Sequence, residues 1–406
     1  MRVHFWSSTE YSGFLEALVH ELTRIGIPAK QRFQVSEASY RSANKVWERL
    51  WLRLRQYLFY PIQLCISLIW ERFRSRFLGV LSRGNRSEAE VIIVSTNTFY
   101  APLLATLLHP QVVYLVYDLF PEAMIHSGKW KEGSLQVKIV RWITRQSLNR
   151  SQLNIFLGQR LKDYVEKIHG PVLNSKIIAV GSDNLLFRLS PKDRHKSIRV
   201  SSVPTLLYCG NFGNMHDSTT IFQYWKKLAE SSYYASRVRE KPEKLVPPER
   251  YEVQWEFYCS GPNQSKLQMV YSQLPEPMKR RICLGNGLDE KAWIEKMEAA
   301  DVALITMLPG SQTVVMPSKT YSAMAAGQAI LAIAPEHSDL VDLIKESDCG
   351  WFIEPGDIRR LELVLADIVS NKKSVLEKRE NAYKYAHSSL GQDALARQWK
   401  AALESL

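Results

Sequence analysis

The sequence is poor in cysteine and has no long apolar run, and each absence excludes a class of protein. Its five cysteines are odd in number, scattered along the chain and never spaced as C-x-x-C, so neither a disulfide framework nor a zinc site is expected. No apolar run approaches the roughly 20 residues that a membrane-spanning helix needs, and the first residues show no signal-peptide pattern. Internal repeats and low-complexity tracts are also missing. These absences favour a globular protein of the reducing cytoplasm.

The length of 406 residues is enough for two domains, or three, each with its own core. Short apolar runs typical of buried parallel strands alternate with segments of helical periodicity in both halves of the chain. Two such series predict an α/β protein with two Rossmann-like, doubly wound domains. The expected organisation is an N-terminal domain at 1–189, a charged linker at 190–204, a second domain at 205–385, and a C-terminal helix at 386–406 that can pack back on the first domain.

Positive charge is concentrated in one N-terminal segment. Of the formal net charge of +12, the stretch from Lys30 to Arg86 contributes +9, with twelve basic and three acidic residues. Such a local excess predicts an anionic partner, and the two candidates are membrane lipid and nucleic acid.

Residues 46–80 read as two amphipathic helices in which bulky apolar side chains alternate with arginines, the second helix following Pro61. This pattern suits helices that lie in a lipid headgroup layer, which would make the protein peripheral at the inner membrane. The alternative is that both helices pack on the sheet and turn their arginines to water. Nucleic acid is not expected, because the tryptophans belong to an apolar face instead of being free to stack on bases. The residues proposed for membrane contact are Trp47, Arg49, Trp51, Arg53, Arg72 and Arg76.

A polar segment follows the apolar run 112–116 in the first half. Asp118, Glu122 and His126 stand just past the end of this predicted strand, where open α/β sheets bind ligands. A histidine there can bind a sugar hydroxyl or transfer a proton. The alternative is a turn with an acidic first helical turn. The loop at Ser12 and Gly13, after the first strand, lies at the same edge of the predicted sheet.

The strongest signal in the second half is the stretch 316–327, which stands between two buried-strand patterns. Pro317 and Ser318 are typical of a helix start, the serine as a cap for a free N–H group, and Gly327 is typical of a helix end. With Lys319 beside it, the helix start predicts a phosphate site. The two glycines of 210–213 are a weaker phosphate-loop signal.

The second half resembles the donor domain of GT-B retaining glycosyltransferases, in the family 4-like subgroup that builds colanic acid, O-antigen and capsule. The resemblance rests on an ordered series of segments, and residues 118–122 resemble that subgroup's Asp-aromatic-Pro-Glu segment. The segments are Leu207-Tyr208-Cys209-Gly210-Asn211-Phe212-Gly213, Cys259-Ser260-Gly261-Pro262, Ala300-Asp301-Val302-Ala303-Leu304-Ile305, Pro317-Ser318-Lys319-Thr320-Tyr321, Ala323-Met324-Ala325-Ala326-Gly327 and Glu354-Pro355-Gly356-Asp357.

The resemblance implies two Rossmann-like domains that face each other across a cleft. It implies a nucleotide-sugar donor in the second domain, a lipid-linked or polysaccharide acceptor in the first, and transfer with retention and without a metal or cofactor. The implied donor-phosphate residues are Gly210, Asn211, Gly213, Ser318 and Lys319. The implied nucleotide or sugar contacts are Gly261, Thr313, Pro317 and Ser322. The implied catalytic residues are Asp118, Glu122 and His126, and the implied acceptor contacts are Ser12 and Gly13.

Two sets of residues depart from the subgroup's pattern. The Arg and Lys that often hold the donor phosphates after the first strand of the second domain are absent, and Asn214, His216 and Asp217 stand near there instead. Members of the subgroup also carry paired glutamates where this chain has Val314 and Ser322. The second glutamate holds the ribose hydroxyls, so Ser322 is a weaker, neutral substitute. An inactive relative that acts as a binding or scaffold partner in polysaccharide assembly is therefore the alternative to an enzyme. The retained Lys319 and the 210–213 turn favour the enzyme.

Overall fold

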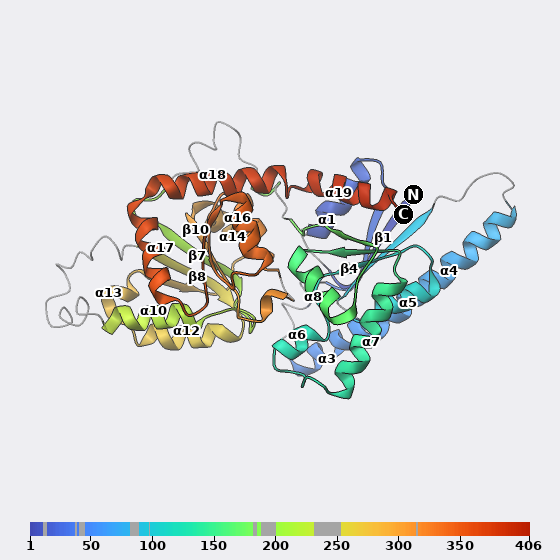
Figure 1. Cartoon of the computed structure of the whole chain (residues 1–406), viewed down its shortest axis with the longest axis horizontal. Coiled ribbons are helices and arrows are strands. Elements are labelled where there is room, and N and C mark those ends of the chain that lie inside the picture. The colour runs from blue at the N-terminus through green and yellow to red at the C-terminus, as the bar shows by residue number, and fades with distance from the viewer. Residues whose placement is uncertain are drawn as a thin grey trace. The chain divides into compact units, whose positions relative to one another are not determined.

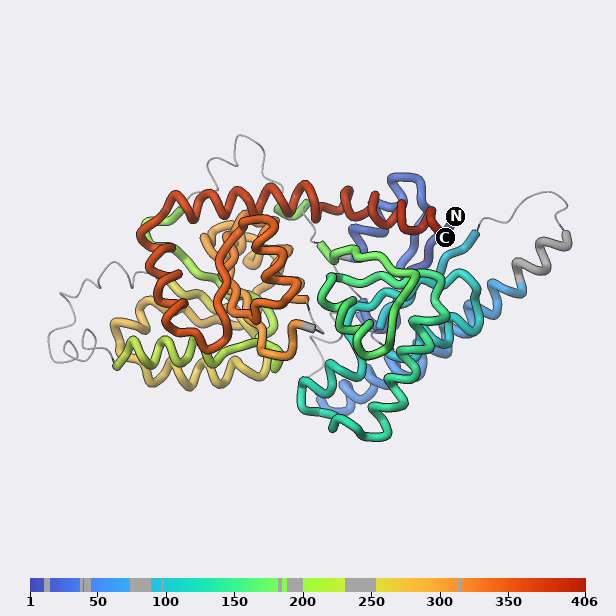
Figure 2. Tube along the Cα trace, viewed as in Figure 1, coloured from blue at the N-terminus to red at the C-terminus, as the bar shows by residue number. Residues whose placement is uncertain are grey.

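The computed structural model describes residues 1–10, 14–36, 39, 45–81, 89–96, 98–181, 185–187, 200–230, 253–313 and 316–406, with the backbone alone at 14, 74–81 and 313. These residues form two compact units, one of Met1–Val180 with Gln392–Leu406 and the other of Gly181–Gly391 (Figure 1). Met1 and Leu406 line the same hollow in the first unit, so the two chain ends lie close together (Figure 2). The domain boundaries expected from the sequence stay predictions, and much of the expected linker lies outside the described residues.

The first unit is built on a parallel six-stranded sheet in the order β2-β1-β3-β4-β5-β6. The four inner strands, β1, β3, β4 and β5, are buried over most or all of their length, as parallel strands covered on both faces are. Their bounds are β1 Arg2–Thr9, β2 Ala29–Val35, β3 Glu90–Ser95, β4 Val112–Val116, β5 Leu153–Phe156 and β6 Ser175–Ile177.

Neighbouring residues of β1 show which helices cover each face of this sheet. The ring of Phe5 lies 5.6 Å from that of Trp399 in α19 (Gln392–Glu404), and α19 packs on α1 (Phe14–Arg24). The next residue, Trp6, points the other way and lies 6.5 Å from Tyr60 of α4 (Tyr60–Leu81). Helix α4 packs on α5, and α5 packs on α7, so these three helices are consecutive neighbours on that second face (Figure 1). The remaining helices of the unit are α3 Val46–Leu54, α5 Ala101–Leu108, α6 Glu122–His126, α7 Leu135–Arg150 and α8 Gln159–His169.

The two helices expected within 46–80 form one continuous helical segment. Helix α3 passes into a π-helical turn at Arg55–Phe59, and α4 begins at Tyr60. The expected break at Pro61 is therefore wrong. Pro61 stands in the first turn of α4, where its missing N–H group and ring would disturb a regular α-helical ladder, and the wider π turn relieves that conflict. No helix among the described residues is both long enough and apolar enough to cross a membrane.

The second unit contains another parallel six-stranded sheet, in the order β12-β11-β10-β7-β8-β9. Its strands are β7 Thr205–Asn211, β8 Gln254–Ser260, β9 Ile282–Gly285, β10 Val302–Thr306, β11 Ala329–Ile333 and β12 Gly350–Ile353. Its helices include α10 Thr219–Glu230, α12 Pro262–Ser272, α13 Glu276–Lys279, α14 Glu290–Ala299, η4 Ser311–Thr313, α15 Lys319–Ala325, α16 Asp339–Ser347, α17 Ile358–Ser370 and α18 Lys372–Ser388. The predicted pair of Rossmann-like sheets is therefore confirmed.

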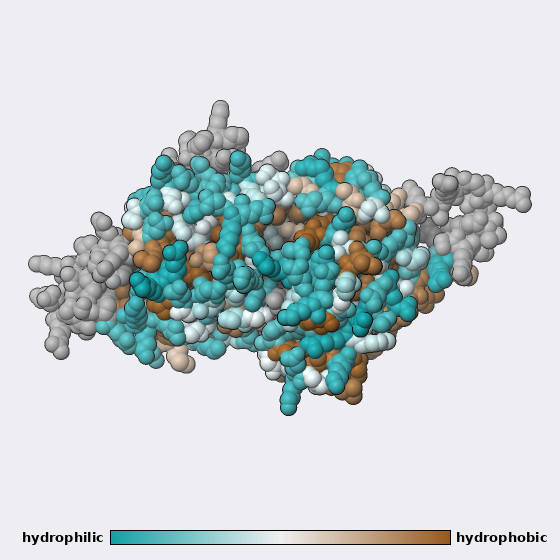
Figure 3. All heavy atoms as spheres, in the orientation of Figure 1, coloured by the Kyte–Doolittle hydropathy of each residue, from teal (hydrophilic) through white to brown (hydrophobic). Residues whose placement is uncertain are grey.

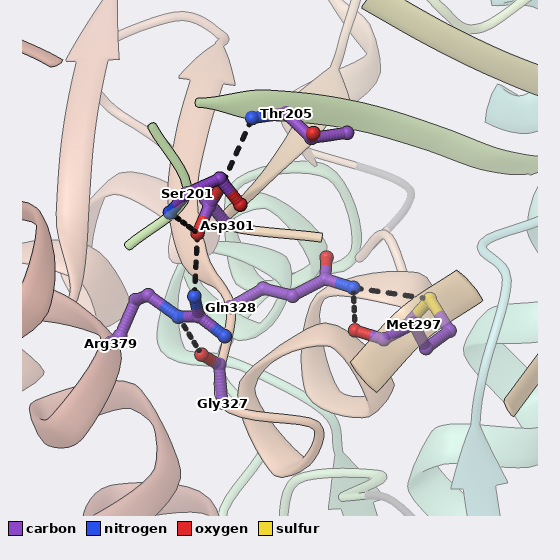
Figure 4. A network of polar contacts seen from close by, with 7 residues as sticks. All are labelled: Ser201, Thr205, Met297, Asp301, Gly327, Gln328 and Arg379. Carbon is purple, nitrogen blue, oxygen red and sulfur yellow. Dashed lines mark hydrogen bonds and ion pairs between the residues drawn. The ribbon is translucent and has the colours of Figure 1, made fainter. Parts of the chain in front are cut away.

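A buried ion pair ties α18 to the start of β10. The guanidinium Nη1 of Arg379 lies 2.7 Å from Oδ1 of Asp301, and both side chains are almost wholly buried. Asp301 also accepts from the backbone N–H groups of Ser201 and Thr205, and Arg379 Nε donates to the carbonyl of Gly327 (Figure 4). Each buried charge therefore has several partners, which a buried pair needs because desolvation is costly. The network fixes the segment that leads out of α15.

Candidate functional site

The second sheet changes direction between β7 and β10. From β7 the chain continues outward to β8 and β9, and from β10 it continues the other way to β11 and β12. In open α/β sheets, ligands bind at such a switch point, beyond the carboxyl ends of the strands. The turn 210–213 follows β7, and α15 follows β10, so both predicted phosphate segments leave the sheet at this edge.

Lys319, the first residue of α15, joins the two sides of the switch point. Its ammonium group donates hydrogen bonds to the phenol oxygen of Tyr208 at 2.7 Å and to the carbonyl oxygen of Asn211 at 3.1 Å. The same group lies 4.1 Å from the centre of the Tyr208 ring, a cation–π distance. Tyr208 in turn donates to the carbonyl of Asn211 at 2.9 Å. A lysine held this way between β7 and α15 presents a positive charge at the edge where open α/β sheets bind ligands.

Burial shifts the ionisation of the groups around Lys319. Burial lowers the pKa of Lys319 to about 7, because the charged form loses its water shell and its hydrogen-bond partners, Tyr208 Oη and the Asn211 carbonyl, are neutral. Burial and the nearby Lys319 charge lower the pKa of His216 to about 4. His216 Nδ1 lies 2.8 Å from the carbonyl oxygen of Thr306, which can only accept, so Nδ1 carries the hydrogen and Nε2 is left as an acceptor. The site therefore holds a neutral imidazole, that of His216, and a lysine whose protonated form a bound anion would stabilise.

Close packing of two glycine turns shapes the loop after β7. Gly210 and Gly261 have φ angles of +114° and +107°, which residues with a Cβ rarely adopt. A Cβ on Gly261 would lie 2.4 Å from Oδ1 of Asn211, so the second turn must be glycine for the two loops to touch. Asn263 completes the contact by donating from Nδ2 to the carbonyl of Gly213 at 2.9 Å. The structure thus gives Gly261 a packing role beside the predicted donor site.

Helix α15 differs from its expected form at its start. Ser318 makes no side-chain capping bond, because its own backbone is already helical, so the predicted cap is wrong. Its side chain is exposed, whereas Pro317 is buried. The predicted end is confirmed, since Gly327 has a φ of +75°.

Lys319 and Ser322 line a cavity of about 50 Å³, shared with Leu207 and Cys209 of β7 and with residues of β10 and α14. This volume accommodates a few water molecules and is far too small for a nucleotide.

In the first unit, Asp118 lies two residues after the end of β4 and is half-buried. Its backbone N–H and that of Tyr117 both donate to Oγ1 of Thr96, at 3.0 and 3.1 Å, which holds the turn against the end of β3. Burial raises the pKa of Asp118 to about 6. This side chain can therefore gain and lose a proton near neutral pH, as a general acid or base must.

Glu122 is buried, at 1% exposed, and Arg141 Nε of α7 donates to its Oε1 at 2.8 Å. The contact holds α6 against α7. His126, at the other end of α6, is exposed. No hydrogen bond or ion pair joins Asp118, Glu122 and His126 to one another within the described ranges. Their catalytic roles stay predictions.

Several candidates cannot be placed. Ser12, Gly13 and Val314 lie outside the described residues, as does the side chain of Thr313. Conversely, His216 lies beside the end of β10, at the switch point, but is not among the residues that the sequence predicts for the site. The available signal was its place six residues after Gly210, in the loop that follows a buried strand.

Among known proteins, no family model matches the chain. The chain is 23% identical to the "Probable glycosyltransferase WbjE" of Pseudomonas aeruginosa over 336 residues, which cover 77% of this chain and 76% of that protein. The relative is thus similar over most of both proteins.

Solved structures with a similar fold include HepE of Anabaena in complex with UDP, with a TM-score of 0.67 at 14% identity over the whole of both chains. HepE in complex with UDP-glucose gives a TM-score of 0.64 at 15% identity, again over the whole of both chains. The sucrose-phosphate synthase of Thermosynechococcus elongatus gives 0.64 at 12% identity, over all of this chain and 98% of the other. With its two doubly wound parallel sheets, the chain therefore has the GT-B fold.

Proposed function

We propose that this protein is a glycosyltransferase that takes a sugar from a nucleotide-sugar donor bound at the β7–β10 switch point. The observation that carries the proposal is Lys319, held 2.7 Å from Tyr208 Oη and 3.1 Å from the carbonyl of Asn211 at that edge. The relative in Pseudomonas aeruginosa supports glycosyl transfer, and the HepE structures with UDP and UDP-glucose support the donor class. UDP-sugars are therefore the first donors to test.

The chemistry follows from the leaving group. When the anomeric bond breaks, negative charge builds on the departing diphosphate, and a fixed cation stabilises that charge most in a site that excludes water. Lys319 can supply this charge, because a bound diphosphate raises its lowered pKa and fixes a proton on it. Exposed Ser318 and the backbone of the 210–213 turn are the further donors expected for the phosphates, and Ser322 is the one expected for the ribose.

We propose that transfer proceeds with retention and without a bound metal, as in the family 4-like surface-polysaccharide enzymes that the sequence resembles. The one group of potential metal ligands among the described residues is His4, Glu71 and Glu90, whose ligand atoms lie within 4.8 Å of one another. It belongs to the first unit, where Glu90 begins β3, and Glu71 also lies 3.8 Å from Arg32. It is not part of the switch-point site of the second unit.

We also propose a lipid-linked or polysaccharide acceptor bound by the first unit. Asp118, with its pKa near 6, would take the proton of the acceptor hydroxyl, and exposed His126 would orient sugar hydroxyls. Glu122 would act as a positioning residue, since Arg141 occupies its buried carboxylate. The expected contacts at Ser12 and Gly13 belong to the same proposal.

The test is donor binding to the full chain, measured by calorimetry and saturation-transfer NMR with UDP-, GDP-, ADP- and CMP-sugars. We expect one nucleotide class to bind and the enzyme to hydrolyse that donor slowly without an acceptor. If none of the donors binds while circular dichroism and thermal unfolding are normal, the proposal fails.

The matched control is Lys296→Met. Lys296 is also half-exposed, lies 5.0 Å from the ring of Tyr258 and belongs to the same unit, but it pairs with Glu256. Donor binding is expected to survive Lys296→Met and to weaken in Lys319→Met. Equal loss in both variants would indicate a general effect on the fold instead of a phosphate contact.

A further inference from the structure

Helix α4 has two apolar faces, and only one of them is covered. Tyr60, Leu64 and Leu68 are buried against the first sheet. On the opposite side of the helix, about half a turn away, another apolar row is exposed. Its members are 46–64% exposed and comprise Ile62, Ile66, Ile69, Trp70 and Phe73. A surface helix normally carries one apolar stripe and one polar face, so a second apolar row this exposed to solvent is unusual.

Helix α7 repeats the pattern. Val137, Val140 and Leu148 face the interior, and an outer row of Leu135, Ile139 and Trp142 is 49–74% exposed. Between α4 and α7 lies α5, whose Leu107 is 54% exposed. Because the three helices cover one face of the sheet as consecutive neighbours, their outer sides face away from it in the same general direction.

Helix α3 adds aromatic surface to the same unit. Leu52 is buried against Val35, whereas Trp47, Leu50 and Trp51 are 49–66% exposed. With Arg53, Leu54 and Tyr57 they line a wide hollow of about 660 Å³. Figure 3 shows apolar residues gathered at the surface where Figure 1 labels α7 and α3. An exposed apolar patch on this scale marks an interaction site, unlike single apolar residues scattered over a surface.

The charges beside these rows identify the kind of partner. Arg53 on α3, Arg72 on α4, and Lys138 and Arg145 on α7 are exposed and stand on the helices that carry the apolar rows. Acidic residues are few in this part of the chain, which carries +9 between Lys30 and Arg86. A second copy would bring the same positive charge and be repelled. Tryptophan beside arginine and lysine is instead the composition of surfaces that lie at the headgroup level of a bilayer.

We propose that the outer faces of α3, α4, α5 and α7 form one membrane-docking surface that lies on an anionic lipid leaflet. The apolar rows insert among the headgroups, and the basic side chains contact lipid phosphates. No helix crosses the bilayer, in accord with the described helices. The surface stands on the geometry of the first unit and does not depend on the donor site of the second.

The test is flotation of the full chain with vesicles of phosphatidylcholine, with and without phosphatidylglycerol. We expect binding to the anionic vesicles that weakens as salt is added, because the basic side chains are exposed to screening ions. Ile139→Ser with Trp142→Ser, and Trp70→Ser with Phe73→Ser, should each lower the partition coefficient about tenfold or more. Arg53→Glu with Arg145→Glu should weaken binding to a similar degree, about tenfold.

The matched control is Met269→Ser with Leu363→Ser, which removes two exposed apolar side chains of the second unit. Vesicle binding should be unchanged in this variant. Equal binding by wild type and all the docking-surface variants would overturn the proposal. So would a wild-type dimer in sedimentation velocity that the Trp142 variant dissociates, since the surface would then be an interface between copies. Nucleotide binding by the docking-surface variants, measured in parallel, separates this proposal from the proposed transferase activity.

Discussion

The ammonium group of Lys319 lies 2.7 Å from the phenol oxygen of Tyr208, although 111 positions separate the two residues in the chain. The contact joins α15 to β7 across the point where the second sheet changes direction. Within the described part of the chain, the half-buried lysine donates its hydrogen bonds to two neutral groups, the phenol of Tyr208 and the carbonyl of Asn211. Burial therefore lowers the pKa of this lysine, and a bound anion would raise it again. We therefore expect the protonation of Lys319 and the binding of a phosphate group to depend on each other.

Replacing Lys319 with methionine should weaken donor binding and leave the fold intact. Methionine keeps most of the side chain's apolar length but removes the charge, and a charge-assisted hydrogen bond contributes about 1.5–3 kcal/mol, or roughly ten- to a hundredfold in affinity. The free energy of unfolding should not fall, because no buried carboxylate is left unpaired. Calorimetry with the preferred donor measures the first effect, and urea unfolding measures the second. If the donor affinity of Lys319→Met equals that of wild type, Lys319 does not contact the donor phosphates.

Donor affinity should depend on pH through the same residue. Below pH 7 Lys319 is already charged, so its contribution is constant. Above pH 7 the free protein must take up a proton on binding, so affinity should fall as pH rises above about 7. Calorimetry of a UDP-sugar in buffers of different ionisation enthalpy should register proton uptake at pH 8. The Lys319→Met variant should show neither the uptake nor this slope.

Two glycine variants separate steric crowding from backbone strain. Gly261→Ala would place its Cβ 2.4 Å from Oδ1 of Asn211, whereas Gly356→Ala, at a φ of +90°, would meet nothing within 4 Å. Gly356→Ala should cost about 1–2 kcal/mol of unfolding free energy, from the left-handed backbone alone. Gly261→Ala should cost more and also weaken donor binding, because the Asn211 side chain must turn away and the Phe212 carbonyl, a backbone atom 3.0 Å from the new Cβ, must shift. Chemical denaturation and calorimetry test both, and equal costs would contradict the crowding.

Asp118 should make the protein less stable as pH rises from 4 to 6. Its pKa is about 6 in the folded chain and 3.8 in the reference state, so the folded form binds the extra proton in that interval. This contribution is fully present below pH 4 and lost as pH rises through 6. Asp118→Asn should therefore be more stable than wild type at pH 8, by on the order of 2 kcal/mol, and not at pH 4. If Asp118 is also the catalytic base, the variant should lose transfer activity while it still binds donor.

His216 should remain neutral well below the usual range of histidine. Its pKa of about 4 follows from burial and from the charge of Lys319, and its Nδ1–H bond to Thr306 fixes the tautomer. Nitrogen-15 NMR of the imidazole should show one protonated Nδ1 and no titration between pH 5 and 8. An apparent pKa near 6.5 would contradict this arrangement. In the Lys319→Met variant the pKa of His216 should rise, because the positive charge of Lys319 no longer disfavours the protonated imidazole.

Much of the architecture was readable from local pattern. Short apolar runs and helical periodicity predicted two Rossmann-like sheets, and residues such as Gly327 marked element ends, because these signals depend on neighbours in the chain. The apolar rows of the segment 46–80 were also visible in the sequence as helical spacing. The sequence could not say which side of each helix is covered, since one apolar stripe on α4 is buried by the sheet and the other is exposed. The sequence also predicts a helix break at Pro61, whereas in the structure a π turn at Arg55–Phe59 joins α3 and α4 into one continuous helical segment.

The candidate sites depended far more on tertiary structure. The sequence by itself determined that a lysine stands at a helix start after a buried strand, and that two carboxylates and a histidine follow another. Only the folded chain decided that Lys319 reaches Tyr208 and Asn211, that Arg141 pairs with Glu122, and that His216 reaches Thr306 at the end of β10. These contacts join residues 19 to 111 positions apart. Burial and long-range pairing set ionisation and exposure, and neither is encoded in the spacing of neighbouring residues.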